Sequence, residues 1–322
     1  MREFELIDSL RRRLVATRAD TRLGIGDDAA ILAPPPGHEV VITTDTLIAG
    51  RHFPDDTPPE DIGFKSIAVN LSDLAAMGAD PAWLTIALAA PALSDDWCDR
   101  FIDGVIEALS DTAVDVVGGD TTKSDTLTIS ITALGLVPEG TALRRDGAQV
   151  GDLVAVTGSL GDAAAGLLCW PHRDRAGADE RVLISRLTRP TARAGARLRG
   201  RVHAAIDVSD GLLADLGHIL SLSAMGATID IDALPSSPAL ARYAASADER
   251  RRLQATGGDD YELCVTLAAD RLDAARAALD CPLTVIGRIE PQPGLRLIDA
   301  HGDPLDPDWL ARAGWDHFDG HS

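Results

Sequence analysis

The chain has 322 residues, of which 45% are hydrophobic and 25% charged, a globular composition whose length suggests about two domains. Its net charge of −20 argues against a nucleic-acid-binding surface, because neutralising phosphates requires basic side chains. The longest apolar run, residues 84–93, is too short to cross a membrane, which needs about 20 residues.

The N-terminal sequence MREFELIDSLRRRL predicts an amphipathic helix rather than a secretory signal, which would carry an apolar core before a small-residue cleavage site. The four cysteines, Cys98, Cys169, Cys264 and Cys281, are scattered and form no CxxC pair. This pattern is typical of small apolar residues in a reducing cytosol. We therefore expect a cytoplasmic protein without a structural zinc site.

Hydrophobic periodicity divides the first part of the chain into helices and strands. We predict helices over 1–20, 60–78 and 94–110, and strands over 40–46, 83–90, 114–117 and 126–137. Gly78 predicts the end of the second helix, and Gly-Gly-Asp at 118–120 follows the short third strand. The Gly-rich polar segment 138–152 predicts a boundary between domains 1–138 and 139–322.

The second part of the chain repeats this alternation. We predict strands at 153–157 and near 227–232, 262–267 and 283–288, helices at 162–169, 190–199 and 270–279, and a strand-turn-helix over 204–220. Residues 171–180 form a polar stretch between expected elements. Segments 70–78 and 207–217 each place a Ser-Asp pair at or near an expected helix start, with Gly some turns on. This similarity is either chance or an indication of two halves with related topology. The alternation predicts an α/β or α+β fold.

Acidic residues recur beside Gly, Thr and Ser in six short motifs instead of forming solvated runs. The motifs are 26–28, 43–46, 70–73, 118–122, 207–211 and 257–260. One Asp beside Gly is typical of a turn or helix cap, but six such sites indicate carboxylates gathered at a functional site. Two carboxylates about 4 Å apart repel by about 4 kcal/mol at an effective dielectric near 20, so a cluster favours bound cations. Oxygen ligands without His or Cys favour Mg²⁺, commonly held together with substrate phosphates.

The basic residues limit how phosphate can be bound. Only two lysines, Lys65 and Lys123, occur, and no Gly-Lys dipeptide is present. A Walker A loop and the protein-kinase signature set are therefore absent from the sequence. Metal ions, Arg and backbone N–H groups would have to bind any phosphate.

Several other features allow both a functional and a structural interpretation. The segment 24–29 matches a dinucleotide fingerprint, which we reject because no clear strand precedes it and two Asp stand where a pyrophosphate would approach. Arg144-Arg145 is either a solvated interdomain pair or a fork for nucleotide phosphate. His52 is either structural or a substrate contact, and Trp315 either packs a tail or covers an aromatic ligand.

Seven motifs, in chain order, carry a resemblance. They are GIGDDAA, TTDTLIAGRHF, KSIAVNLSDLAAMGADPAW, GGDTT, AIDVSDGLLADLGHI, GGDDYELC and GWDHF. From residue 4 to residue 318 the chain resembles the thiamine-monophosphate kinase family. The resemblance implies the two-domain fold of the aminoimidazole ribonucleotide synthetase-like superfamily, with the N-terminal sheet pairing with a second copy into a dimer barrel. It also implies that ATP phosphorylates thiamine monophosphate to thiamine diphosphate, with several Mg²⁺ ions.

The same resemblance implies a role for individual residues. Metal-binding positions match Asp28, Thr43, Thr44, Asp45, Asp73, Asp120, Asp207 and Asp210, of which Asp45 and Asp210 are expected to matter most for catalysis. Nucleotide contacts match Gly119, Asp120, Arg145 and Ser209, and thiamine-phosphate contacts match His52, Asp259 and Trp315. The family often has GGEDYE where this chain has GGDDYE, so Asp259 is one methylene shorter than the usual residue.

Two alternative functions are weighed against this interpretation. Another ATP-dependent synthetase of the superfamily is one, although selenophosphate synthesis would call for an N-terminal reactive Cys with a nearby Lys, and the first cysteine here is Cys98. A non-catalytic Mg²⁺- or nucleotide-binding regulator is the other, and it has no obvious need for two substrate phosphate sites. For the kinase we expect direct in-line transfer without a covalent enzyme intermediate, because a phosphate monoester is already anionic and needs little or no general base.

Overall fold

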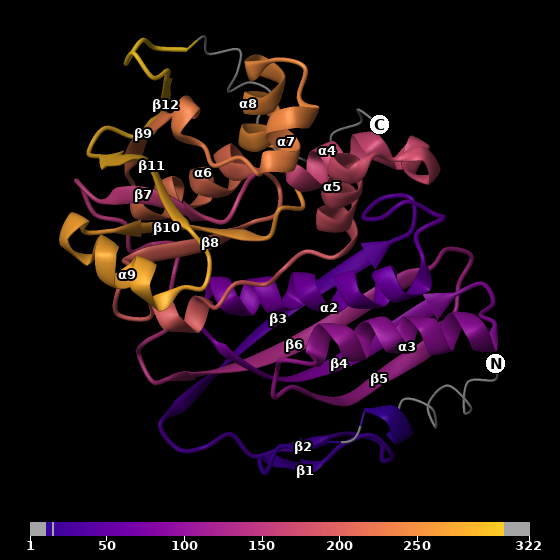
Figure 1. The fold of residues 1–322 in the computed structure, drawn as a ribbon. Helices are drawn as coiled ribbons and strands as arrows, with labels where there is room; N and C mark the ends of the chain where they lie inside the picture. Colours follow the sequence, from indigo (N-terminus) through magenta and orange to yellow (C-terminus); the bar gives the residue numbers. More distant parts are fainter. Residues whose placement is uncertain (1–10, 15, 306–322) are drawn as a thin grey trace. The chain divides into compact units, whose positions relative to one another are not determined.

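The structure is a computed structural model that describes residues 11–14 and 16–305 (Figure 1). The chain divides into two compact units, one formed by Met1–Ala75 with Ala79–Ala142 and the other by Ala76–Gly78 with Leu143–Ser322. Each unit has its own main β-sheet and its own helices, so the α/β class expected from the sequence is confirmed. Within the described residues, no helix is long and apolar enough to span a membrane.

The first unit is built on a four-stranded sheet in the order β3-β6-β4-β5. Its strands are β3 (His38–Ile48), β4 (Asp80–Ala90), β5 (Asp115–Lys123) and β6 (Thr128–Pro138). β6 pairs antiparallel with both β3 and β4, while β4 and β5 are parallel. A separate two-stranded sheet joins β1 (Thr21–Leu23) to β2 (Ile31–Leu32).

Helices α2 (Pro59–Ala76) and α3 (Asp95–Leu109) lie on the same face of the four-stranded sheet (Figure 1). The helices approach closely through glycines, since a Cβ on Gly63 would lie 2.2 Å from the Phe101 carbonyl oxygen. Strand residues facing the helices, such as Ile129 and Ile131, are buried. The alternate residues form what we call the open face of the sheet, which includes Val40, Ile42, Thr44 and Thr46 of β3 and Ser130 and Thr132 of β6. This face is covered at Trp83 of β4, which is buried and packs in one cluster with Ala30 and Leu32.

The second unit contains a six-stranded sheet in the order β12-β9-β11-β7-β10-β8. The strands are β7 (Leu153–Thr157), β8 (Ala204–Val208), β9 (Gly226–Asp230), β10 (Glu262–Leu267), β11 (Leu283–Glu290) and β12 (Gly294–Ile298). Only the β12–β9 pair is parallel among the strand pairs of this sheet. Its helices are α4 (Asp162–Cys169), α5 (Ala178–Thr188), α6 (Leu212–Ser223), α7 (Pro238–Tyr243), α8 (Ala247–Thr256) and α9 (Leu272–Ala278).

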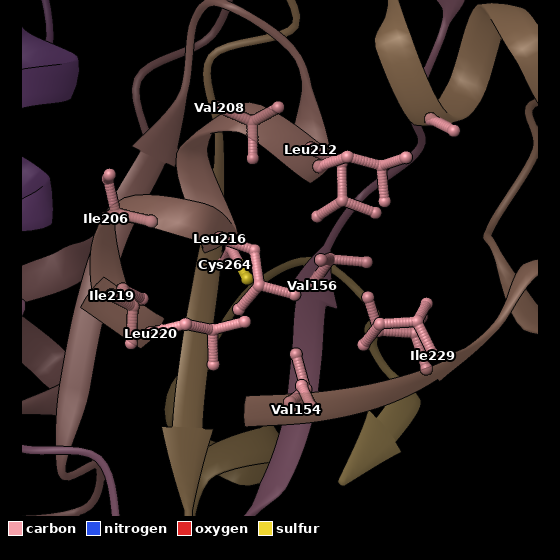
Figure 2. Close-up of a cluster of buried hydrophobic side chains, with 14 of the residues drawn as sticks. Val154, Val156, Ile206, Val208, Leu212, Leu216, Ile219, Leu220, Ile229 and Cys264 are labelled. Carbon is pink, nitrogen blue, oxygen red and sulfur yellow. The ribbon is translucent and has the colours of Figure 1, made fainter. Parts of the chain in front are cut away.

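The largest part of the second unit's core lies between this sheet and α6. Leu212, Leu216 and Ile219 of α6 point toward apolar side chains of β7 and β8, with Cys264 of β10 among them (Figure 2). All these side chains are almost fully buried. The cluster therefore anchors the turn that leads from β8 into α6.

The structure corrects several expectations about local structure. Residues 1–10 and 15 of the helix predicted over 1–20 lie outside the described residues, and residues 16–20 are not helical. The helix predicted over 190–199 is wrong: the chain forms α5 at Ala178–Thr188, and only Gly195–Leu198 makes a short 3₁₀ turn. The N-terminus of α5 is capped by a hydrogen bond from the Gly177 N–H to the Glu180 carboxylate at 2.6 Å. Pro190 follows the C-terminal end of this helix. This helix begins within the polar stretch 171–180.

Two further corrections concern the acidic motifs. β5 does not end before the Gly-Gly-Asp segment but runs through it to Lys123. The Ser-Asp pair at 72–73 lies in the C-terminal part of α2, not near its start, whereas the pair at 209–210 does precede α6. The similarity of the two motifs therefore does not reflect a shared position on a helix.

Candidate functional site

In the first unit, β3 and α2 bring the predicted residues Thr43, Asp45 and Asp73 together with Asn70. We call these four residues the α2–β3 cluster. The Thr43 hydroxyl donates to the Asp73 carboxylate, and the Asp45 N–H donates to the Asn70 side-chain oxygen at 3.1 Å. Asn70 is buried, and its amide also donates to the Ser66 carbonyl at 3.0 Å. The cluster thus ties the middle of β3 to the C-terminal part of α2.

The sheet separates this cluster from two other predicted residues. Asp45 of β3 is in register with Ile131 of β6, which is in register with Ile86 of β4 and, next to it, Gly119 of β5. This row of residues faces the helices. Thr44 lies on the open face, where its hydroxyl is 2.9 Å from that of Thr132. Asp120 is also on the open face, in the row that crosses Ala87, Ser130 and Thr46. Neighbouring residues of a strand point to opposite faces, so the predicted ligands of this unit lie on two faces of the sheet.

Gly119 has a structural reason to be glycine. A Cβ at this position would lie 1.9 Å from the Ile86 carbonyl oxygen in β4. Gly118 has no such restriction, because its nearest neighbour would be the Thr85 methyl at 3.8 Å. The backbone of β5 therefore passes β4 closely at Gly119 and presents the exposed Asp120 next to it.

Asp28 lies in the exposed segment between β1 and β2, where its N–H donates to the Asp27 carboxylate at 2.8 Å. A short strand, β1, does precede this motif, contrary to our expectation. The motif leads to strand β2 and not into a helix, so the strand-turn-helix that binds a dinucleotide is not formed.

His52 follows β3 and is half-buried. The Ile48 N–H donates to its Nδ1 at 3.0 Å, which places the imidazole proton of the neutral ring on Nε2. The Lys65 ammonium, 2% exposed, donates to the His52 carbonyl at 3.0 Å. The orientation of His52 is therefore set by its own strand end and by α2.

In the second unit, predicted residues converge where β8 meets α6, and we call Asp207, Ser209, Asp210 and Asp259 the β8 loop cluster. Asp207 is buried at the end of β8, and Ser209 and Asp210 follow it half-buried. The Asp259 N–H donates to the Ser209 carbonyl at 2.8 Å, and the Tyr261 hydroxyl is 3.0 Å from the Asp259 carboxylate. Asp259 has a left-handed φ of 67°, which is uncommon for a residue other than glycine.

Asp215 in the first turn of α6 is a residue that the sequence reasoning missed. Its carboxylate accepts hydrogen bonds from the N–H groups of Ser209 and Asp210. Burial, together with the nearby negative charge of Asp210, raises the pKa of Asp215 to about 7. The signal available in the sequence was its place in DVSDGLLAD, one turn after the Ser-Asp pair.

The remaining acidic residues of the GGDDYE motif are structural. Asp260 is buried, which raises the pKa of its carboxyl group well above the ordinary value, and it accepts a hydrogen bond from the Gly161 N–H at 2.7 Å. Glu262 is fully buried and forms ion pairs with Arg186 and Arg193. These contacts fix the segment that carries Asp259.

The other predicted residues are spread more widely. Arg145 is exposed, and its carbonyl accepts from the Ser223 hydroxyl at 3.1 Å, while Arg144 pairs with Asp146. Trp315 lies outside the described residues. Within residues 11–14 and 16–305, no group of three or more His, Cys, Asp or Glu side chains is arranged to hold a metal ion.

Comparisons with known proteins agree with this architecture. Residues 26–137 match the family model of the AIR synthase related protein N-terminal domain, and residues 149–300 match that of its C-terminal domain. The chain is 44% identical to the thiamine-monophosphate kinase of Salmonella typhimurium over 324 aligned residues, which cover 98% of each chain. It is 40% identical to that of Haemophilus influenzae over 91% of each chain.

Solved structures give the same result. The thiamine-monophosphate kinase of Stenotrophomonas maltophilia K279a has a TM-score of 0.86 and 48% identity, covering 95% of this chain and 98% of the other. A complex of AaThiL with AMPPCP and TMP has a TM-score of 0.79 and 34% identity, covering 99% of both chains. The two-domain fold implied by the sequence motifs is confirmed, and the chain belongs to the thiamine-monophosphate kinase family.

Proposed function

We propose that this protein transfers the γ-phosphate of ATP to thiamine monophosphate, forming thiamine diphosphate and ADP. The observation that carries the proposal is the near-complete match to thiamine-monophosphate kinases, one of them solved with AMPPCP and TMP. The α2–β3 cluster and the β8 loop cluster support it, because each contains several of the residues that the family motifs single out.

Mg²⁺ is the metal that we assign to the reaction. Several ions are proposed rather than one shared site, because the predicted ligands of the first unit lie on two faces of its sheet. The residues that would hold these ions are Asp28, Thr43, Thr44, Asp45, Asp73, Asp120, Asp207 and Asp210. Their donor atoms are all carboxylate or hydroxyl oxygens, which fit a hard cation with several retained waters or substrate phosphates. When bound, Mg²⁺ neutralises the repulsion between the two anionic substrates.

The protein's own residues bind and orient the two substrates. Gly119, Asp120, Arg145 and Ser209 are assigned to the nucleotide, and His52, Asp259 and Trp315 to thiamine monophosphate. His52 with its proton on Nε2 can donate a hydrogen bond to an anionic oxygen. The acceptor phosphate is already anionic, so direct in-line transfer requires orientation rather than a strong general base.

A homodimer that uses the first unit's sheet is part of the proposal. Ile42 is 63% exposed and Val40 40% exposed on the open face, next to a row of Thr and Ser hydroxyls. A second copy covering this face would bury these apolar side chains.

We assign metal and ATP binding with dimerisation to residues 1–138, and nucleotide and substrate contacts to residues 139–322. We assign a cytoplasmic location to the protein.

The decisive experiment mixes the purified full chain with ATP, Mg²⁺ and thiamine monophosphate and measures thiamine diphosphate and ADP. We expect the two products in equal amounts, no reaction after chelation of Mg²⁺, and no phosphorylated enzyme during turnover. ATP binding without thiamine diphosphate would instead favour a regulator or a different synthetase. A phosphorylated enzyme that forms and decays at the rate of turnover would overturn direct transfer.

A further inference from the structure

Asp215 has no part in the substrate and metal contacts proposed above. It nevertheless contacts the main chain of Ser209 and Asp210, two residues to which such contacts are assigned. Its Oδ2 atom accepts two main-chain hydrogen bonds, from Ser209 N–H at 3.0 Å and from Asp210 N–H at 3.1 Å. The side chain is only 3% exposed. A buried carboxylate with two main-chain donors on one oxygen holds those two peptide groups in a fixed orientation.

The opposite side of the same loop is held by segment 258–261. The Ser209 carbonyl accepts from Asp259 N–H, and the Val208 carbonyl accepts from Tyr261 N–H, both at 2.8 Å. A Cβ on Gly258 would lie 2.6 Å from the Ser209 carbonyl oxygen. The loop is therefore bonded on one side to α6 and on the other to the GGDDYE segment.

The turn into α6 depends on Gly211. Its φ of 113° disfavours any residue with a side chain, and its carbonyl accepts from the Asp215 N–H at 3.0 Å. The bonds described here use the main-chain atoms of Ser209 and Asp210. They therefore fix the loop without consuming the Ser209 hydroxyl or the Asp210 carboxylate.

We propose that Asp215 is a positioning residue for phosphoryl transfer, which presents the Ser209 hydroxyl and the Asp210 carboxylate to the nucleotide and its metal from one rigid loop. The proposal rests on the proposed function, in which Ser209 contacts the nucleotide and Asp210 binds the metal. Residues that orient a metal ligand commonly change affinity or activity by about 10- to 100-fold when they are removed.

The test compares variants of the full chain by calorimetric binding of AMPPCP with Mg²⁺. Asp215→Ala removes the acceptor, and Asp215→Leu removes it while keeping the volume of the buried side chain. Both are expected to weaken binding by about 10- to 100-fold. Asp215→Asn is expected to stay close to wild type, because the amide oxygen can accept both N–H groups that Oδ2 accepts. A purely structural role would lower the Tm of Asp215→Ala and Asp215→Leu without weakening AMPPCP binding by the folded protein.

Asp152→Ala is the matched control. Asp152 is a buried carboxylate of the same unit that accepts from the Gln149 N–H and contacts His203, away from the β8 loop cluster. The proposal is overturned if Asp215→Ala and Asp215→Leu bind no more weakly than Asp152→Ala. If neither Asp215→Ala nor Asp215→Leu folds, Asp215→Asn decides the question. A tenfold loss of AMPPCP affinity in Asp215→Asn at unchanged Tm overturns the proposal, and an affinity equal to that of wild type supports it.

The proposal and the proposed function fail in different ways. A wild-type protein that binds AMPPCP but makes no thiamine diphosphate disproves the proposed acceptor, while the comparison of Asp215 variants still stands. A wild-type protein that phosphorylates thiamine monophosphate while all Asp215 variants bind AMPPCP equally disproves only the role of Asp215.

Discussion

Aspartates with similar sequence surroundings have different environments in this protein. Asp28 and Asp120 are exposed, Asp45 and Asp73 are half-buried next to α2, and Asp207 is buried at the end of β8. The Gly, Thr and Ser residues beside these aspartates predicted a shared role in metal binding, but they did not predict how deeply each carboxylate is buried. The environment of each carboxylate depends on the strand face or helix end that carries it.

Asp45→Asn and Asp210→Asn are expected to lower kcat by at least about 100-fold, because an amide is a poor substitute for a carboxylate that neutralises charge in the transition state. The near-isosteric change preserves the Asp45 N–H bond to Asn70 and the Asp210 N–H bond to Asp215, so folding is expected to survive. Steady-state kinetics and Tm measure the two effects. Turnover near that of wild type at ordinary Mg²⁺ would contradict the metal-binding roles.

The ion pair between Arg251 and Asp232 gives a pH-dependent prediction. Hydrogen bonds from the Arg251 guanidinium lower the pKa of Asp232 below its ordinary value of 3.8. The stabilisation is therefore present above pH 3.8 and is lost as the pH falls through the lower, folded-state pKa. Arg251→Gln is expected to reduce the free energy of unfolding by about 1 kcal/mol at neutral pH and by less under strongly acidic conditions.

Urea unfolding at neutral and strongly acidic pH checks this difference. Arg175→Gln removes one positive charge at an exposed position and serves as the control. An equal loss of stability at both pH values for Arg251→Gln would show that the ion pair does not titrate as the structure indicates.

At the scale of elements, β5 and α2 show how packing determines what a motif does. The Gly-Gly-Asp motif was expected to follow a strand, but β5 continues through it because Gly119 allows close contact with β4. The NLSD motif was expected near a helix start, but its Asn70 and Asp73 contact β3 from the C-terminal part of α2. Residues of both motifs therefore contact neighbouring strands instead of forming turns.

Gly119→Ala and Gly118→Ala form a matched pair that tests this interpretation of β5. The new Cβ at position 119 would lie 1.9 Å from the Ile86 carbonyl oxygen, so we expect a loss of at least about 2 kcal/mol in unfolding free energy. At position 118 the nearest atom lies at 3.8 Å, and we expect a change below about 1 kcal/mol. Chemical denaturation measures both values, and similar losses for the two variants would argue against the close approach.

At the scale of the whole molecule, the open face of the first unit's sheet is the surface that we assign to association. Ile42→Glu places a charge in this face and is expected to convert the dimer to a monomer. Leu222→Glu is the control, since Leu222 is 61% exposed in the second unit and has no place in the proposed interface. Sedimentation velocity distinguishes the species, and an unchanged sedimentation coefficient for Ile42→Glu would exclude this face as the dimer interface.

The sequence by itself determined the α/β class, most helices and strands, and the family, because hydrophobic periodicity and the order of the motifs are properties of the chain alone. The tertiary structure alone decided that Thr44 and Asp120 lie on the opposite face of the sheet from Asp45, since this follows from strand register and pleat. It also placed α5 at Ala178–Thr188 and the Asp215 carboxylate within hydrogen-bond distance of the Ser209 and Asp210 N–H groups. A capping bond and a main-chain contact between elements become visible only after the chain has folded.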